Sequence, residues 1–494
     1  MTDWGIFIDL GIVGVALLAA TALRAKVALL QRFLIPNAIV AGLMLLLFYN
    51  LLAPLLGMGT PIGVETDGSA VDAAAAADPQ AGPKVLVFHL LNLTMIAMGL
   101  RAPSEQPQKG ASRPVLATAT VIVSQVSLQG VVGFGLTFAF IALPFLPSLF
   151  PSYGYLVTLG YALGPGQAFS IGSAWEASGF AGAGGLGLIF GAVGFLIACF
   201  VGVILINYGV RCGLTATSAE ELWQRSRHSG LLGKDEARPS GMALTSRSEA
   251  IDSLSLNLGV VFVVYLATFL LVLGVTSLLN TYGGDAGGRL ASNFWGLSFI
   301  FGLLLALVTR GVLSALGKAH YLDPGALTRI SGGSVDFMVA AALGAISFAV
   351  VSANWLPVVV FSVVVAIVAF VSILWLTSRL FPGNYAFERA VLYWGTLTGT
   401  LSTGLALLRV LDPELKTPVA PNYVYASGIS FFVLLPYILN MNRPVDAELC
   451  GCDRPLYIAL IVMLAYLLVV AAAFLFLRPK DPAKARSGAC LWAR

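Results

Sequence analysis

Two glycine-rich stretches of this sequence combine helix-breaking residues with hydroxyl and amide side chains. The first is YALGPGQAFSIGSAW, from Tyr161 to Trp175, and the second is YWGTLTGTLSTGLALLR, from Tyr393 to Arg409. Free carbonyls of a broken helix, together with hydroxyl oxygens, are ligands for a hard cation such as Na+, whereas the N–H groups that begin a half-helix favour a carboxylate. The two stretches therefore predict a site for a small anion and a cation.

Both stretches supply candidate ligands. The predicted substrate-binding residues are Gly164, Pro165, Gly166, Gln167, Ser170, Thr400, Ser402, Thr403 and Arg409, and the predicted ion-binding residues are Ser173, Thr398, Gly399, Asp336 and Asn92. Gln167 follows Gly166 at the expected start of a half-helix, where its amide can donate to a carboxylate or to a neutral amide. A single serine or threonine hydroxyl more often bonds to the preceding turn of its own helix, so this prediction depends on the two clusters together.

Three further polar positions have two interpretations each. Asp336 either ligates Na+ or caps the N-terminus of a spanning helix. His89 and Asn92 lie one turn apart; they form either a structural hydrogen-bonded pair, which we favour, or a polar face directed at the first break. Arg409 either clamps a substrate carboxylate or extends to the cytoplasmic interface beside Asp412.

Other polar and glycine positions are predicted to be structural. Gln125 and Gln129, one turn apart, are expected to form hydrogen bonds between helices, and Asp9 is expected at the outer interface. The glycine-rich segment from Phe180 to Phe195 lacks the proline and the paired hydroxyls of the two breaks. We therefore expect it to be a surface for close helix packing.

The five cysteines show no metal-binding spacing. Cys450 and Cys452 are expected in an external loop, where a local or an intermolecular disulfide can form, although two free thiols are the simpler prediction. No cofactor and no metal other than Na+ as a coupling ion are expected.

The composition is that of an integral membrane protein. Hydrophobic residues make up 58% of the 494 residues and charged residues 11%, which leaves too little polar surface for a soluble globule, and a net charge of +4 does not indicate a nucleic-acid partner. Continuous apolar runs predict helices rather than barrel strands. The expected spans are 5–23, 33–56, 85–100, 115–145, 184–210, 254–279, 294–316, 335–352, 356–376, 423–439 and 456–477.

The order of these spans repeats on either side of a polar linker. The predicted domains are a first repeat, 1–210, with a re-entrant hairpin near 154–175; a cytoplasmic linker, 211–253; a second repeat, 254–440, with a hairpin near 391–409; an additional helix, 454–477; and a cytoplasmic tail, 478–494. Lysines and arginines in the short loops predict an external N-terminus and a cytoplasmic C-terminus. An odd number of crossings precedes the linker, so the repeats are inverted.

Four segments resemble the bacterial sodium/glutamate symporters. They are RFLIPNAIVAGL, GYALGPGQAFSIGSAW, SVDFMVAAALGAIS and GTLTGTLSTGLALL, and the resemblance extends from Trp4 to Asn440. The hairpin motifs differ from those of the family. The family has G-G-H-G followed by threonine where this chain has Gly164 to Ala168, and G-A-T-P-T where this chain has Gly399 to Thr403.

The resemblance implies a sodium-coupled transporter of glutamate or a related amino acid or organic anion. It further implies an all-α polytopic membrane protein with two inverted five-helix repeats, each with a re-entrant hairpin, and alternating access of the elevator kind. A homodimer surrounded by lipid in the plasma (inner) membrane is the implied assembly. The extra C-terminal helix lies outside the resemblance.

Other functions remain as alternatives. Proton coupling through Asp336 or His89 would replace Na+. A channel would need a pore lined by charges or carbonyls and no mobile hairpin domain, so two opposed hairpins argue against it. An intramembrane enzyme would need convergent catalytic groups, and the few buried ionisable residues are far apart in sequence. No P-loop motif is present for ATP-driven transport.

Overall fold

The fold is helical throughout the part of the chain that the structure describes. The computed structural model describes residues 5–32, 35–55, 79–101, 112–143, 149–215, 241–247, 249–282, 291, 294–412 and 417–479. Within these residues, ten helices are long and apolar enough to cross a membrane. The chain is therefore a multi-pass helical membrane protein, as the composition predicts.

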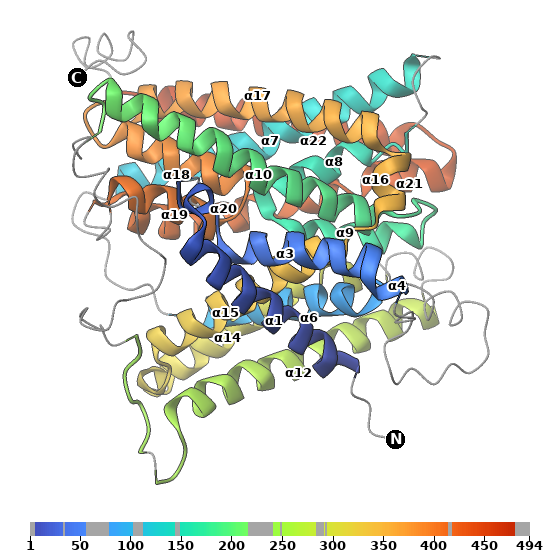
Figure 1. The fold of residues 1–494 in the computed structure, drawn as a ribbon. Coiled ribbons are helices and arrows are strands. Elements are labelled where there is room, and N and C mark those ends of the chain that lie inside the picture. Colours follow the sequence, from blue (N-terminus) through green and yellow to red (C-terminus); the bar gives the residue numbers. More distant parts are fainter. Residues whose placement is uncertain are drawn as a thin grey trace.

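The helices form two layers (Figure 1). The lower layer in this view contains α1 (Gly5–Lys26), α3 (Asn37–Leu47), α6 (Ala81–Leu100), α12 (Ser253–Tyr282), α14 (Ser298–Ala315) and α15 (Pro324–Gly344). The upper layer contains α7 (Ser112–Ala142), α10 (Ala183–Arg211), α17 (Trp355–Leu380), α20 (Val419–Asn440) and α22 (Arg454–Leu477), together with the short helices of the two glycine-rich stretches.

Packing within the lower layer follows a mirrored pattern. Helix α1 packs on α3 as α12 packs on α14, and α3 packs on α15 as α14 packs on α6, while α6 and α15 pack on each other at the centre. Glycines allow two of these contacts to be close. A methyl group at Gly42 would lie 2.7 Å from Cβ of Leu343, and one at Gly99 would lie 2.8 Å from Cβ of Ala306.

Helix α15 differs from the expected span 335–352. Asp323 caps the helix by accepting a hydrogen bond from the N–H of Ala326 at 2.7 Å, and Pro324 occupies the first turn, where its missing N–H costs nothing. The first half of α15 is polar, so an apolar-run criterion misses it. Asp336 therefore lies in the middle of α15 and is exposed; the interpretation of Asp336 as a helix cap is wrong.

The rest of the expected span 335–352 is interrupted. Helix α15 ends at Gly344, and after a short break α16 (Phe348–Ala353) leads into α17 in the other layer. Asn50 holds this break, because its Nδ2 donates to the carbonyl of Ile346 at 2.8 Å and its Oδ1 accepts from the N–H of Phe348 at 2.9 Å. Asn50 belongs to a π-helical turn, η1 (Phe48–Leu52), between α3 and α4 (Ala53–Leu55).

The C-terminal helix α22 belongs to the upper layer. Its Tyr466 ring packs against Tyr437 of α20 with centroids 5.1 Å apart, and its Phe474 ring stacks on Trp375 of α17 at 4.9 Å. Arg113 at the start of α7 donates to the carbonyl of Leu477 at 2.9 Å. Helix α22 corresponds to the additional spanning helix that the sequence predicts at 454–477.

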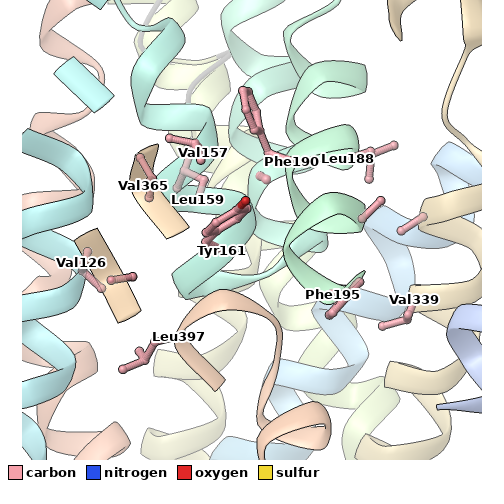
Figure 2. Packing of buried hydrophobic residues seen from close by; sticks show 14 of the residues in the cluster. Val126, Val157, Leu159, Tyr161, Leu188, Phe190, Phe195, Val339, Val365 and Leu397 are labelled. Carbon is pink, nitrogen blue, oxygen red and sulfur yellow. The ribbon is translucent and has the colours of Figure 1, made fainter. Parts of the chain in front are cut away.

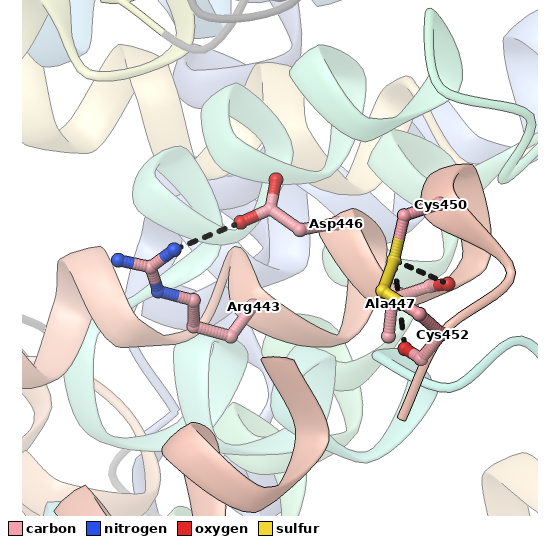
Figure 3. Close-up of a disulfide and its surroundings, with 5 residues drawn as sticks. All are labelled: Arg443, Asp446, Ala447, Cys450 and Cys452. Atoms are coloured by element: carbon pink, nitrogen blue, oxygen red, sulfur yellow. Dashed lines mark hydrogen bonds and ion pairs between the residues drawn. A yellow bond between two sulfur atoms is a disulfide. The ribbon is translucent and has the colours of Figure 1, made fainter. Parts of the chain in front are cut away.

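A disulfide precedes α22 (Figure 3). Cys450 at the end of α21 (Arg443–Cys450) is bonded to Cys452, and an exposed ion pair at 3.5 Å joins Arg443 to Asp446 on the same short helix. The preference for two free thiols is therefore wrong. The turn at Gly451, which has a φ of 59°, brings the two cysteines together.

Candidate functional site

The first glycine-rich stretch is a helix that breaks at Gly164. Helix α8 (Tyr153–Thr158) continues into a π-helical turn, η2 (Leu159–Leu163), and α9 (Pro165–Glu176) begins immediately after the break. Gly164 has a φ of 104°, which a residue with a side chain rarely adopts, and Pro165 occupies the first turn of the new helix. The residue types at the break thus explain its position.

The chain reverses direction at this break. Tyr153 at the start of α8 and Trp175 near the end of α9 both lie beside Phe180, with ring centroids 6.1 Å and 6.4 Å away. Helix α9 packs along the glycine face of α10, where a methyl group at Gly187 would lie 2.6 Å from the carbonyl oxygen of Ala168 and one at Gly191 2.8 Å from Cβ of Pro165. The predicted packing surface between Phe180 and Phe195 is confirmed.

The second glycine-rich stretch is also a broken helix. Helix α18 (Ala386–Thr398) ends before Gly399, Thr400 has extended backbone angles, and α19 (Leu401–Leu411) follows. The two helices lie side by side, because a methyl group at Gly404 would lie 2.6 Å from the carbonyl oxygen of Leu392 and one at Gly395 would lie 2.6 Å from Cα of Gly404. This break too turns the chain back on itself.

The two breaks meet inside the molecule. A methyl group added at Gly164 would lie 3.5 Å from Cγ2 of Thr400, and η2 packs beside α18, so the two turns are neighbours. Gly194 of α10 contacts both broken helices, because the carbonyl oxygen of Thr398 lies against its Cα and a methyl group there would lie 2.8 Å from Cδ1 of Tyr161. Figure 2 shows this region, with Tyr161 and Leu397 entering from the two broken helices beside α10.

Helices of the upper layer fix the two breaks. Tyr161 is fully buried and donates from its hydroxyl to the carbonyl of Ser362 on α17 at 3.1 Å. Gln129 on α7 is also fully buried, and its Nε2 donates to the carbonyl of Leu397 at 3.0 Å. Helix α17 therefore holds the first break, and helix α7 holds the second.

Helix ends give the junction its electrostatic character. The first turns of α9 and α19 leave N–H groups without an intrahelical acceptor, and the last turns of η2 and α18 leave carbonyls without an intrahelical donor. Helix N-termini attract anions and C-termini attract cations. The junction can therefore hold a carboxylate and a small cation next to each other.

The predicted residues of the first break lie at different depths along α9. Gly166 is at the tip, where a methyl group would lie 2.8 Å from Sδ of Met338 and 3.1 Å from Cδ1 of Leu91 in the lower layer. Gln167 is buried, and its Oε1 would lie 3.4 Å from a methyl group added at Gly164. The amide of Gln167 is therefore part of the junction.

Two serines of α9 lie away from the junction. Ser170 donates to the carbonyl of Gly296 at 2.6 Å and so joins α9 to the segment that precedes α14. Ser173 lies farther along α9, against Gly184. Neither hydroxyl faces the turn at Gly164.

The hydroxyls of the second break divide into two groups. Thr396 and Thr398 donate to carbonyls in the preceding turn of α18, Leu392 at 2.8 Å and Trp394 at 2.6 Å, as expected for single hydroxyls. Thr400 lies at the turn, with its Oγ1 3.3 Å from that of Thr403, which is buried. The backbones of Gly399 and Ser402 belong to the same turn.

The structure separates the remaining predicted residues from the junction or from each other. Arg409 is exposed in the last turn of α19, about 13 Å along the helix axis from Thr400 at ~1.5 Å per residue. His89 does not pair with Asn92; its Nδ1 lies 2.5 Å from the hydroxyl of Tyr265 on α12, so the favoured pairing is wrong.

Asn92 is nevertheless close to the first break. It follows Leu91, which contacts Gly166, and it is fully buried. Its Nδ2 donates to the carbonyl of Phe88 at 3.0 Å, while its Oδ1 has no hydrogen-bond partner. Asp336 precedes Met338, the other lower-layer contact of Gly166, by two residues of α15.

Arg389 is a buried residue that the sequence analysis missed. Its side chain is fully buried in the first turns of α18; Nε and Nη2 donate to the backbone and side-chain oxygens of Asn384 at 3.1 Å and 3.2 Å, and Nη1 lies 3.3 Å from the hydroxyl of Tyr393. The guanidinium also lies 4.4 Å from the centroid of the Phe381 ring. The available signal was an arginine in the first turn of a helix that is otherwise mostly apolar.

A polyvalent metal centre has no support in the described part of the chain. No group of three or more histidine, cysteine, aspartate or glutamate side chains within it is arranged to hold a metal ion. The oxygen atoms at the junction come from backbone carbonyls, hydroxyls and amides. Such neutral oxygens suit a monovalent cation better than a divalent one.

Comparison with known protein families, with curated proteins and with solved structures finds no match to this chain. The resemblance to the sodium/glutamate symporters therefore remains a prediction from the four quoted segments. What the geometry itself establishes is a multi-pass helical membrane protein in which two broken helices meet in the interior.

Proposed function

We propose that the protein is a secondary active transporter that carries a small organic anion, with glutamate as the first candidate, in symport with Na+. The observation that carries this proposal is the proximity of Gly164 and Thr400, where the ends of two broken helices lie next to each other in the interior. Broken helices that line a polar site between internal repeats are typical of secondary transporters.

In this proposal each broken helix is a re-entrant hairpin of one inverted repeat. The reversal of the chain at Gly164 and at Gly399 supports the hairpins. The contacts among the lower-layer helices support the repeats, because α1, α3 and α6 correspond in their packing to α12, α14 and α15. The external N-terminus, the cytoplasmic C-terminus and the inner-membrane location follow from the loop charges and belong to the same proposal.

The two layers suggest how access alternates. The hairpins contact α7, α10 and α17 extensively, so they would move with the upper layer past α6 and α15 of the lower layer. In the lower layer, Leu91 of α6 and Met338 of α15 contact the first hairpin tip at Gly166, and the buried residue Asn92 follows Leu91 in α6. A homodimer through the lower layer completes the elevator-like arrangement that the resemblance implies.

Proton coupling is the second candidate, and one observation favours it. Asp336 is an exposed acidic residue in the middle of α15, two residues before Met338, which contacts the tip of the first hairpin. A carboxylate at that position can carry a proton during transport. In contrast, the contact of His89 with Tyr265 within the lower layer gives His89 a structural partner.

The test is uptake of labelled L-glutamate into proteoliposomes under an inward Na+ gradient, with K+ and proton gradients as controls. We expect Na+-driven accumulation, and its loss in Gln167→Ala with unchanged purification behaviour. Ser173→Ala is a suitable control, because Ser173 lies away from the junction. Accumulation driven by protons alone would favour the second candidate, and no accumulation of glutamate or of competing organic anions would contradict the proposal.

A further inference from the structure

Two glutamines on one face of α7 have different environments. Gln125 and Gln129 lie one turn apart and both are fully buried. Both ends of the Gln125 amide contact one hydroxyl: its Nε2 lies 3.0 Å and its Oε1 3.2 Å from Oγ of Ser372, which also lies 2.6 Å from the carbonyl oxygen of Val368. Gln129 donates from Nε2 to the carbonyl of Leu397, but its Oε1 has no hydrogen-bond partner.

The orientation of the Gln129 amide is determined by its partner. A carbonyl oxygen can only accept a hydrogen bond, so the nitrogen of the amide must face Leu397 and the oxygen must face away. A buried acceptor without a partner costs about 1–3 kcal/mol. A donor such as water, or a cation, would satisfy this oxygen.

The surroundings of Gln129 favour a cation. Leu397 lies in the last turn of α18, directly before the break at Gly399, where carbonyls lack intrahelical donors and the helix dipole is negative. Oε1 faces away from the carbonyl of Leu397, but it belongs to an amide that is bonded to this last turn of α18. Neutral oxygens at a helix C-terminus attract a hard monovalent cation.

We infer that a monovalent cation, Na+ in the first instance, binds between α7 and the C-terminal turn of α18 with Gln129 Oε1 as one of its ligands. This inference rests on the proposed function, to which it adds the location of the coupling ion and the role of Gln129. Binding there would fix the second break against α7, so that the cation orders the turn at Gly399 and Thr400 before the anion binds.

The two glutamines provide a matched experiment that does not depend on transport. Thermal unfolding of the purified full-length protein is measured in NaCl, LiCl, KCl and choline chloride at constant ionic strength, without substrate. Na+ is expected to stabilise the parent protein and Gln125→Leu alike. Gln129→Leu is expected to require at least tenfold more Na+ for the same shift in Tm, since one ligand is lost.

A second variant keeps the experiment informative where Gln129→Leu does not fold. Gln129→Glu has nearly the same shape and retains an oxygen at the position of Oε1, but its second oxygen replaces the donor to the carbonyl of Leu397. We therefore expect it to be less stable than the parent protein without Na+ and to keep the response to Na+. Equal Na+ responses of the Gln125 and Gln129 leucine variants would overturn the inference, as would a parent protein that none of the three alkali cations stabilises.

The outcome for the cation site is separable from the outcome for transport. Na+-driven uptake in the parent protein, combined with an unchanged Na+ response in Gln129→Leu, would leave the proposed function standing and refute the site. A Na+ response that depends on Gln129, in a protein that takes up no organic anion, would support the site and remove the proposed function.

Discussion

A methyl group at Gly194 is predicted to disturb the junction between the two broken helices without disturbing α10 itself. In Gly194→Ala, the new Cβ would overlap the carbonyl oxygen of Thr398 and lie 2.8 Å from Cδ1 of Tyr161. Carbon atoms normally approach to about 3.5–4.0 Å. One of the two broken helices must therefore move away from α10 by roughly 0.7–1 Å.

The expected energetic effect can be worked out from these contacts. Overpacking of a buried site costs about 1–3 kcal/mol, whereas glycine to alanine in the interior of a helix gains about 1 kcal/mol. We expect Gly194→Ala to lose up to about 2 kcal/mol. The control Gly185→Ala lies on the same helix, and its nearest atom, Cγ1 of Val350, is 3.9 Å away, so this variant should be neutral or more stable.

Thermal unfolding and uptake measure the two consequences separately. At about 2.1 cal/mol/K per residue, a chain of 494 residues changes its Tm by ~1 °C per kcal/mol, so the two variants should differ by about 1–3 °C. Uptake should fall far more, because a displacement of about 1 Å at a site that positions reactants can cost roughly 100-fold. The reasoning is refuted if Gly194→Ala and Gly185→Ala have the same Tm and the same rate of uptake.

Three further variants test buried and exposed features of the fold. Arg389→Met should lower stability by about 2 kcal/mol, because the oxygens of Asn384 lose their donors. Loss of the exposed ion pair in Arg443→Met should cost less than about 0.5 kcal/mol. Equal unfolding temperatures of these two variants would contradict the expectation for Arg389. Replacement of Cys450 and Cys452 by serine should cost at most ~1.5 kcal/mol, since the disulfide closes a very short loop, and should leave uptake unchanged; a loss of uptake at unchanged stability would show that the loop takes part in transport.

The positions of both breaks could be predicted from the sequence because local chemistry determines them. Gly164 followed by Pro165 combines a residue that tolerates a positive φ with one that starts a helix. The glycine face of α10 could be predicted for a similar reason, since close packing against α9 leaves no room for side chains. In each case the signal lies within one short segment of the chain.

Features that depend on distant partners could not be predicted. Gln125 and Gln129 have the same residue type, spacing and burial, and only the identity of their partners on α17 and α18 separates them. The pairing of His89 with Tyr265 on another helix is invisible from its neighbour Asn92. Helix α15 was misplaced because its capped, polar first half does not raise the hydropathy of the segment.

The proximity of Gly164 and Thr400 has a consequence for biosynthesis. The two residues are 236 positions apart (400 minus 164), and translation adds about 5–20 residues per second. For roughly 10–50 s the first broken helix must therefore stay in the membrane before its partner has been made. During that interval the backbone carbonyls and N–H groups at the break must be kept away from lipid by α7 and α10, the helices that flank the first broken helix in the chain. The amino-terminal part of the protein therefore has to fold around a site that only the carboxy-terminal part completes.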